Sequence, residues 1–367
     1  MPFSSFTGNE LTVRHLRESL AAARLPHALI LAGPRGAGKY TLAVMLAQAA
    51  NCLTPPSPGH DGLPDFCGVC SSCLRIGEAA DLDARVAEAV AVREELREAD
   101  KKDTRILIQT HPDVLVIPPD PPQLLIKVGQ VRTLIREIYR IPAEARRAFY
   151  IFTSAAFMQE AANSLLKVLE EPPAHATIVL LAENPGELLP TIRSRAGIFR
   201  LGAIPTDQIE RLLAERRPET RAQERALIAR LSEGAIGRAL GFDLAAWLAS
   251  RSDALLLLRT AIQDPDYSAL FHATDSYRAG AEGQQKTEGL LRAAASLLED
   301  LLLLKAGTPQ FLRNVDLARE LEPMSAAVTV DWIEAAARGL RQVESGMRRN
   351  LLRSLALDSF AAQLSGA

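Results

Sequence analysis

The sequence has few aromatic residues, no long apolar run and almost no net charge. Aromatic side chains make up 5% of its 367 residues, and the formal net charge at pH 7 is -2. A charge so close to zero argues against a free-standing nucleic-acid-binding protein, although a subunit of a larger complex could still touch DNA. No apolar run approaches the ~20 residues of a membrane-spanning helix, and the polar N-terminus does not resemble a signal peptide. We therefore expect a cytoplasmic protein.

Cysteine is also scarce, and the four cysteines lie between positions 52 and 73 with the spacing C-x14-C-x2-C-x2-C. Disulfides are rare in cytoplasmic proteins, whereas thiolates at two-residue gaps can converge on one tetrahedral ion. The spacing therefore predicts a closed, structural zinc site. Two alternatives stay open, namely metal-free surface cysteines and an iron–sulfur cluster. The usual bacterial cluster motif has its extra cysteine downstream and followed by proline, which differs from this order. The four candidate ligands are Cys52, Cys67, Cys70 and Cys73.

Predicted strands and helices alternate through the first two hundred residues. Short apolar runs bounded by turn residues indicate strands, and apolar residues recurring every three or four positions indicate helices. Alternation of this kind predicts a parallel sheet covered by helices on both faces. Strands are expected at the start of 29–41 and at 111–117, 148–152 and 177–182, and helices at 11–23, 42–50, 128–138 and 159–171.

A glycine-rich turn joins the first strand to a helix within residues 29–41, LILAGPRGAGKYT. Glycines let backbone N–H groups point at phosphate oxygens, and the helix start and the lysine add positive charge. The stretch fits the phosphate-loop pattern G-x-x-x-x-G-K-[ST] up to its last position. Tyr40 stands where a Ser or Thr hydroxyl should hold Mg²⁺, and Thr41 does not simply substitute because one residue turns a helix by about 100°. Nucleotide binding therefore stays open, with Gly33, Gly36, Gly38 and Lys39 as the loop residues.

A second departure from a hydrolytic site follows the predicted strand at 148–152. In phosphate-loop enzymes this strand ends in an acidic residue that holds the metal ion, with a neighbouring group that orients the attacking water. Here the strand runs into Thr153 and Ser154, followed by two alanines. We therefore expect no ATP hydrolysis by this chain.

A charged segment, residues 78–103, follows the cysteines. It is rich in alanine and in charges of both signs and contains neither proline nor glycine. This composition predicts one long exposed helix or helical arm. A solvated surface helix is the plain interpretation, and a contact with DNA or a partner is the alternative.

Several stretches together resemble the clamp-loader branch of the AAA+ ATPases. The run AANSLLKVLEEPP and the cysteine module are more specific than the phosphate loop alone. Within that branch the chain is similar to bacterial DNA polymerase III subunits that lack a working hydrolytic site. The stretches that carry the resemblance are 25–39, the cysteine module at 52–73, HPD at 111–113, AANSLLKVLEEPP at 161–173 and Ser194-Arg195.

The resemblance implies three parts of the chain. Residues 1–203 would form an α/β AAA+ module, a parallel sheet flanked by helices, with the zinc module (52–73) and the charged insert (78–103) within it. Residues 204–243 would form a small helical lid. Residues 244–367, which carry leucine-rich helical stretches but no chemical motif, would form an all-α collar that holds subunits in a ring.

The resemblance also assigns roles to single residues. Arg195, with Ser194, would act as an arginine finger in the ATP site of a neighbouring gamma/tau subunit, although the family's Ser-Arg-Cys motif ends here in Ala196. The plainer alternative is a surface arginine paired with a local acid. Arg238 matches the family's second sensor arginine, and a surface residue at the start of a helix is the alternative. The degenerate nucleotide site would then comprise Gly33, Gly36, Gly38, Lys39, Thr41 and Arg238.

The implied function is that of a clamp-loader subunit without enzymatic activity of its own. Its partners would be the gamma/tau and delta subunits and, through the complex, the sliding clamp and primer-template DNA. The implied cofactor is a structural Zn²⁺, and binding of ATP or ADP stays open. Two rival interpretations are a gamma/tau-like ATPase with an atypical site and a zinc-dependent DNA-binding module.

Overall fold

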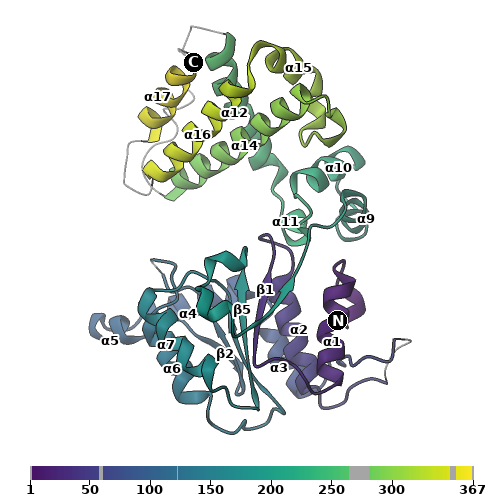
Figure 1. The fold of residues 1–367 in the computed structure, drawn as a ribbon, viewed down its shortest axis with the longest axis vertical. Helices are drawn as coiled ribbons and strands as arrows, with labels where there is room; N and C mark the ends of the chain where they lie inside the picture. The colour runs from purple at the N-terminus through teal and green to yellow at the C-terminus, as the bar shows by residue number, and fades with distance from the viewer. Residues whose placement is uncertain (1, 58–60, 122, 264–280, 348–352, 366–367) are drawn as a thin grey trace. The chain divides into compact units, whose positions relative to one another are not determined.

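The computed structural model describes residues 2–57, 61–121, 123–263, 281–347 and 353–365. It divides into two compact units (Figure 1). The first comprises Met1–Pro205 together with Gly234–Arg238, and the second comprises Thr206–Glu233 together with Ala239–Ala367. Each unit has a hydrophobic core of its own. Among the described residues, none of the helices combines the length and the apolar character needed to cross a membrane.

The first unit is built on a six-stranded sheet with the order β2-β3-β4-β5-β1-β6. Most strands are apolar throughout and fully buried, as expected for parallel strands covered on both faces. The pairings are parallel except that of β2 with β3, which is antiparallel. The strands are β1 (Ala28–Ala32), β2 (Ile108–His111), β3 (Val114–Ile117), β4 (Ala148–Phe152), β5 (Ala176–Ala182) and β6 (Gly197–Arg200).

Two of these strands correct the sequence-based expectation. The single strand expected at 111–117 is a hairpin whose turn lies at Pro112 and Asp113. The edge strand β2 was missed because its short IQTH sequence has no apolar run, and its His111 is buried only through contacts with distant residues. The other edge strand, β6, was missed because its alternating residues are only partly buried.

Helices cover both faces of the sheet (Figure 1). Leu29 and Leu31 of β1 face a core that includes α1 (Glu10–Ala21), α2 (Lys39–Asn51) and α3 (Ser71–Glu78). The intervening residues of β1 face a second core formed with α6 (Val128–Glu137) and α7 (Gln159–Glu170). This two-sided burial follows from the twofold alternation of side chains along a strand. The expected sheet flanked by helices is therefore confirmed.

The charged segment at 78–103 is not one long helix. It forms α4 (Leu82–Glu94) and α5 (Glu98–Asp103), separated by three residues with Arg97 in an extended conformation. The end of α4 is held to the body of the unit because Arg93 is buried and donates to the carboxylate of Asp120. This tertiary contact overrides the helix propensity of the continuous segment.

The second unit is helical. Leu297 and Leu301 lie at the centre of its core, packed with Leu321, Ala336 and Leu357. Arg313, in the turns after α14, forms ion pairs with Glu233, which follows α10, and with Glu299 of α14. The helices are α9 (Thr206–Arg216), α10 (Ala222–Leu231), α12 (Leu244–Gln263), α14 (Ala281–Lys305), α15 (Ala318–Ala327), α16 (Val330–Met347) and α17 (Arg353–Ser365), with the short α11 (Ile236–Leu240) shared between the units. The boundary near 243 between a lid and a collar stays a prediction.

Candidate functional site

The phosphate loop lies between the end of β1 and the start of α2. Gly36 and Gly38 have φ angles of 82° and 86°, in the left-handed region that favours glycine. A Cβ atom on Gly36 would lie 2.7 Å from the backbone nitrogen of Arg238. Gly36 is therefore required both by its own backbone conformation and by a close backbone neighbour.

The lysine of the loop is bonded to the loop itself. Lys39 Nζ donates to the carbonyl oxygens of Gly33 at 2.6 Å and Pro34 at 2.9 Å. Burial lowers the pKa of Lys39, while the carboxylates of Glu183 and Glu187 act to raise it. Sequence reasoning missed these two acids, although Glu183 directly follows β5 and so stands at the edge of the sheet where parallel strands present their carboxyl ends.

The tyrosine that interrupts the motif is directed away from the loop. Tyr40 Oη donates to the carbonyl of Ala79, and the ring packs against the core beneath α2. Burial raises the pKa of Tyr40 well above its usual value. Thr41, one position further on, is exposed. At position 40 the chain therefore lacks the hydroxyl that would hold Mg²⁺ in a phosphate loop, as the sequence indicated.

The segment 234–238 lies directly against the loop. The N–H of Gly237 donates to the carbonyl of Gly36 at 2.7 Å, and the N–H of Ile204 donates to the carbonyl of Gly234 at 2.9 Å. The backbone of Arg238 is thereby placed beside the loop. The structure thus brings together five of the six predicted nucleotide-site residues, Gly33, Gly36, Gly38, Lys39 and Arg238.

The end of β4 carries hydroxyl groups in place of carboxylates. The N–H of Thr153 donates to the carbonyl of Ile117 at 3.1 Å, which continues the pairing of β4 with β3. Ser154 Oγ accepts from the N–H of Ala156 at 3.0 Å. The Ser154 side chain thus shapes the turn after the strand, and neither hydroxyl is an anionic ligand for a metal ion.

Arg195 lies on the surface just after the short helix α8 (Pro190–Arg193). Its Nη2 is 2.9 Å from Glu170 Oε1, and its Nη1 donates to the carbonyl of Thr191 at 3.0 Å. The side chains of Arg195 and Glu170 are 35% and 53% exposed. Ser194 Oγ lies 3.4 Å from the guanidinium. The guanidinium is therefore partly exposed and pairs with a local acid at the surface.

The four cysteines meet in one place. Their Sγ atoms all lie within 4.8 Å of one another. Cys52 follows the last residue of α2, Cys70 is the N-cap of α3, and Cys73 lies within α3. Thr54 and the N–H groups of Val69 and Cys70 donate to Cys67 and lower its pKa to about 6. Four convergent sulfur donors could hold a soft or borderline metal ion.

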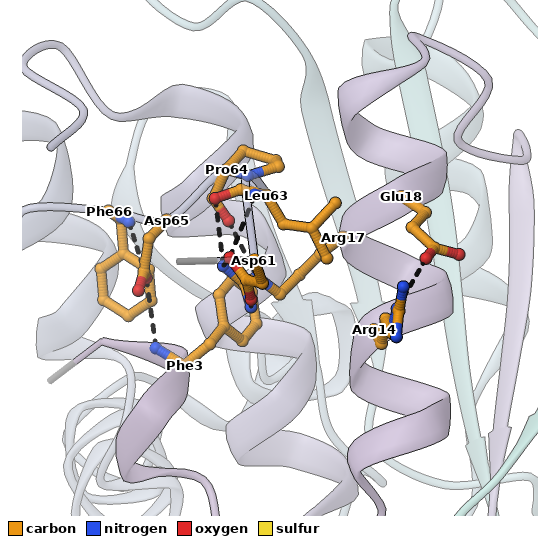
Figure 2. Close-up of polar contacts among 9 residues, drawn as sticks. All are labelled: Phe3, Arg14, Arg17, Glu18, Asp61, Leu63, Pro64, Asp65 and Phe66. Atoms are coloured by element: carbon orange, nitrogen blue, oxygen red, sulfur yellow. Dashed lines mark hydrogen bonds and ion pairs between the residues drawn. The ribbon is translucent and has the colours of Figure 1, made fainter. Parts of the chain in front are cut away.

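Residues 61–64, which precede Cys67, are held by Arg17 of α1 (Figure 2). Arg17 donates to the carboxylate of Asp61 and to the carbonyls of Leu63 and Pro64. The guanidinium also lies 5.4 Å from the ring centroid of Phe3, within the range of a cation–π contact. These contacts anchor residues 61–64 through groups other than the cysteine thiols.

The HPD stretch fastens the cysteine module to the sheet. The Nδ1 of His111 accepts from the N–H of Asp113 at 3.2 Å, so the neutral ring carries its proton on Nε2, 3.4 Å from Ser72 Oγ on α3. Asp113 accepts three backbone N–H bonds of 2.7–2.8 Å from residues 143–145. The pair therefore joins α3, the β2–β3 hairpin and the turn before β4.

Replacing Asp113 by asparagine is expected to lower the free energy of unfolding at pH 7 by about 1–3 kcal/mol, because an amide cannot accept all three bonds. Burial acts to raise the pKa of Asp113, but the three N–H donors outweigh it and lower the pKa. The carboxylate's stabilisation is therefore present above the unfolded pKa and lost as pH falls through the folded pKa. Chemical denaturation should show the difference between the two proteins narrowing below about pH 4. A difference independent of pH would contradict this account.

The family model described as "DNA polymerase III, delta subunit" matches residues 8–205, more than half of the chain. The chain belongs to this DNA polymerase III family. Among similar proteins, the delta' subunit of Bacillus subtilis is 31% identical over 211 residues, 56% of this chain and 52% of that protein. The tau subunit of Escherichia coli is 28% identical over 243 residues, 65% of this chain and 32% of that protein.

A DNA polymerase III gamma subunit-related protein from Thermotoga maritima is a similar solved structure, with 17% identity and a TM-score of 0.42, covering 97% of this chain and 99% of that one. The chain matches only about a third to a half of the length of the curated tau and delta' relatives. The resemblance to bacterial clamp-loader subunits of the DNA polymerase III family, and to delta' among them, is confirmed by the family match and these relatives.

Proposed function

We propose that this chain is the delta' subunit of a DNA polymerase III clamp loader, a member of the complex that does not hydrolyse ATP. It would assemble in the cytoplasm with gamma/tau and delta subunits and help to load the sliding clamp onto primed DNA. The observation that carries the proposal is the end of β4, where Thr153 and Ser154 replace the metal-holding acids. The lysine and glycines of the loop are kept, which fits descent from a nucleotide-binding ancestor.

The contribution of such a subunit to ATP chemistry would be Arg195. Phosphoryl transfer spreads negative charge over the γ-phosphate oxygens, and an arginine from a neighbouring subunit can stabilise that charge. The exposure of Arg195, and its weak surface pairing with Glu170, support this role because the guanidinium can leave its local partner at little cost. We propose that it reaches the site of an adjacent gamma/tau subunit.

A gamma/tau-like ATPase with an atypical site is the second candidate. It is favoured by the tau relative, whose identity is close to that of the delta' relative. The purified chain is expected to show no ATP turnover above the background of a Lys39→Ala variant, because no carboxylate follows β4. Phosphate release measured with Mg²⁺ and DNA tests this. Turnover that Lys39→Ala abolishes would establish the ATPase instead.

We further propose that the four cysteines hold one structural Zn²⁺. The ion would supply no catalysis and would cross-link the end of α2, the following loop and α3. Protein purified without chelator is expected to contain about one zinc per chain by elemental analysis. Cys70→Ser should lower that content, whereas Ser71→Ala should not. Iron with acid-labile sulfide, or no metal, would contradict the proposal.

A further inference from the structure

The residue that interrupts the phosphate-loop motif forms a specific bond to the cysteine module. Tyr40 Oη donates to the carbonyl of Ala79, the residue that caps the C-terminus of α3. The last carbonyls of a helix have no partner within it and need donors from elsewhere. Tyr40 satisfies one of them from the first turn of α2, immediately after the phosphate loop.

Helices α2 and α3 are joined near both ends. At one end, Cys52 after α2 meets Cys73 of α3 within the sulfur cluster. Near the same end, Gln48 Nε2 in the last turn of α2 donates to the carbonyl of Cys73 at 2.8 Å, with both residues buried. At the other end, Tyr40 reaches Ala79. The two helices therefore form an antiparallel pair whose far end begins at the phosphate loop.

The side chain at position 40 determines whether the start of α2, next to the phosphate loop, is bonded to α3. Tyrosine carries a hydroxyl at the end of a long, rigid side chain, and the ring of Tyr40 packs against the same core as α3. A serine or threonine, which the motif requires, holds its hydroxyl one atom beyond Cβ and so lies close to its own helix. With tyrosine in place of serine or threonine, position 40 thus loses a metal ligand and gains a hydrogen bond between α2 and α3.

We propose that Tyr40 is a positioning residue that couples the cysteine module to the phosphate loop, so that metal binding by the four cysteines orders residues 33–41. The inference rests on the proposed function in one respect, because the ordering of the loop would follow metal binding by the four cysteines. It assigns the module a task beyond local stability, namely control of the shape of the phosphate loop. The tie itself is a property of this chain alone and does not depend on assembly.

Hydrogen–deuterium exchange of the full-length chain tests the coupling, with Zn²⁺ or a chelator as the probe. In the wild-type protein, Zn²⁺ is expected to slow exchange in residues 33–41 by about two- to tenfold, the range that one hydrogen bond supplies. Tyr40→Phe keeps the ring and should bind the same amount of zinc, but its loop should no longer respond. Tyr139→Phe is the matched control, since Tyr139 donates an exposed 3.4 Å bond to the carbonyl of Glu171; it should respond as the wild type does.

Two results would overturn the proposal. One is a loop in Tyr40→Phe that responds to Zn²⁺ as fully as the wild type, and the other is a wild-type loop that does not respond although zinc binds. If no zinc binds, the metal part of the proposed function fails, and the coupling is then measured with Cys73→Ala. That variant should speed loop exchange when Tyr40 is present and have no such effect in Tyr40→Phe; equal effects in both backgrounds would refute the tie.

Discussion

Replacing Arg195 by alanine is expected to slow ATP hydrolysis at the adjoining site of the reconstituted clamp loader by about 10³–10⁵-fold. The reason is electrostatic, because the guanidinium would stabilise charge that develops on the γ-phosphate in the transition state. Single-turnover hydrolysis, measured with gamma/tau, delta, the sliding clamp and primed DNA, is the appropriate assay. Total turnover should fall only to the share contributed by the other ATP sites.

The local partner of Arg195 supplies a matched control. Glu170→Ala removes the ion pair seen on the surface of this chain and leaves the arginine in place. If Arg195 acts only through that pair, the two variants should behave alike and lose little, because exposed pairs contribute about 0.2–1 kcal/mol. If Arg195 acts on the neighbour, only the arginine variants should lose activity. Wild-type turnover in Arg195→Ala, with the complex intact by size-exclusion chromatography, would refute the role.

A lysine at position 195 distinguishes the effect of positive charge from the effect of the guanidinium's planar shape. Arg195→Lys keeps the positive charge but loses the planar fork that binds two phosphate oxygens at once. We expect an activity between those of the wild type and Arg195→Ala. We expect the complex to assemble normally in both variants. Within this chain Arg195 bonds to Thr191 and Glu170 at the surface, so its replacement should leave the fold intact.

The sequence allowed prediction of those parts of the site that depend on local chemistry. The glycines of the phosphate loop, the hydroxyls after β4 and the cysteine spacing each follow from what a few adjacent residues can do. In the structure Lys39 bonds to its own loop and the four sulfur atoms lie together. Both could be expected from the sequence because the residues involved lie close to one another along the chain. The helices α6 and α7 and the strand β5 were likewise predictable from periodicity.

What could not be predicted depends on pairs of distant residues of ordinary type. The bond from Tyr40 to Ala79 spans 39 positions, and that between Ser72 and His111 spans another 39. The sequence predicts His111 as the first residue of a strand, whereas it ends β2 and is buried, with Ser72 as a partner of its ring. The acids that influence Lys39 lie beyond β5, and the sheet alone brings them near. Single-sequence patterns carry no signal for such pairings.

The charged insert (residues 78–103) is also held by a pair of distant residues, Arg93 and Asp120, which the sequence did not predict. Breaking this pair is the change for which we expect the largest loss of stability. Arg93→Met is expected to lower the free energy of unfolding by about 3–5 kcal/mol, because it leaves the carboxylate of Asp120 buried without its main counter-charge. Asp120 is fully buried, and its second carboxylate oxygen has no hydrogen-bond partner within the described part of the chain. Lys127 Nζ lies 3.7 Å from Asp120 Oδ1, and this second positive charge should place the loss toward the lower end of that range.

The double variant Arg93→Met with Asp120→Leu distinguishes a buried charge from simple loss of packing. Removing both partners should recover most of the stability, because a well-packed apolar pair avoids the cost of desolvating two charges. Arg14→Met, which breaks an exposed pair with Glu18, should change stability by less than about 1 kcal/mol. Urea denaturation of the three variants measures these differences. If Arg93→Met were as mild as Arg14→Met, the insert would not be anchored through Asp120, and the break between α4 and α5 would need another cause.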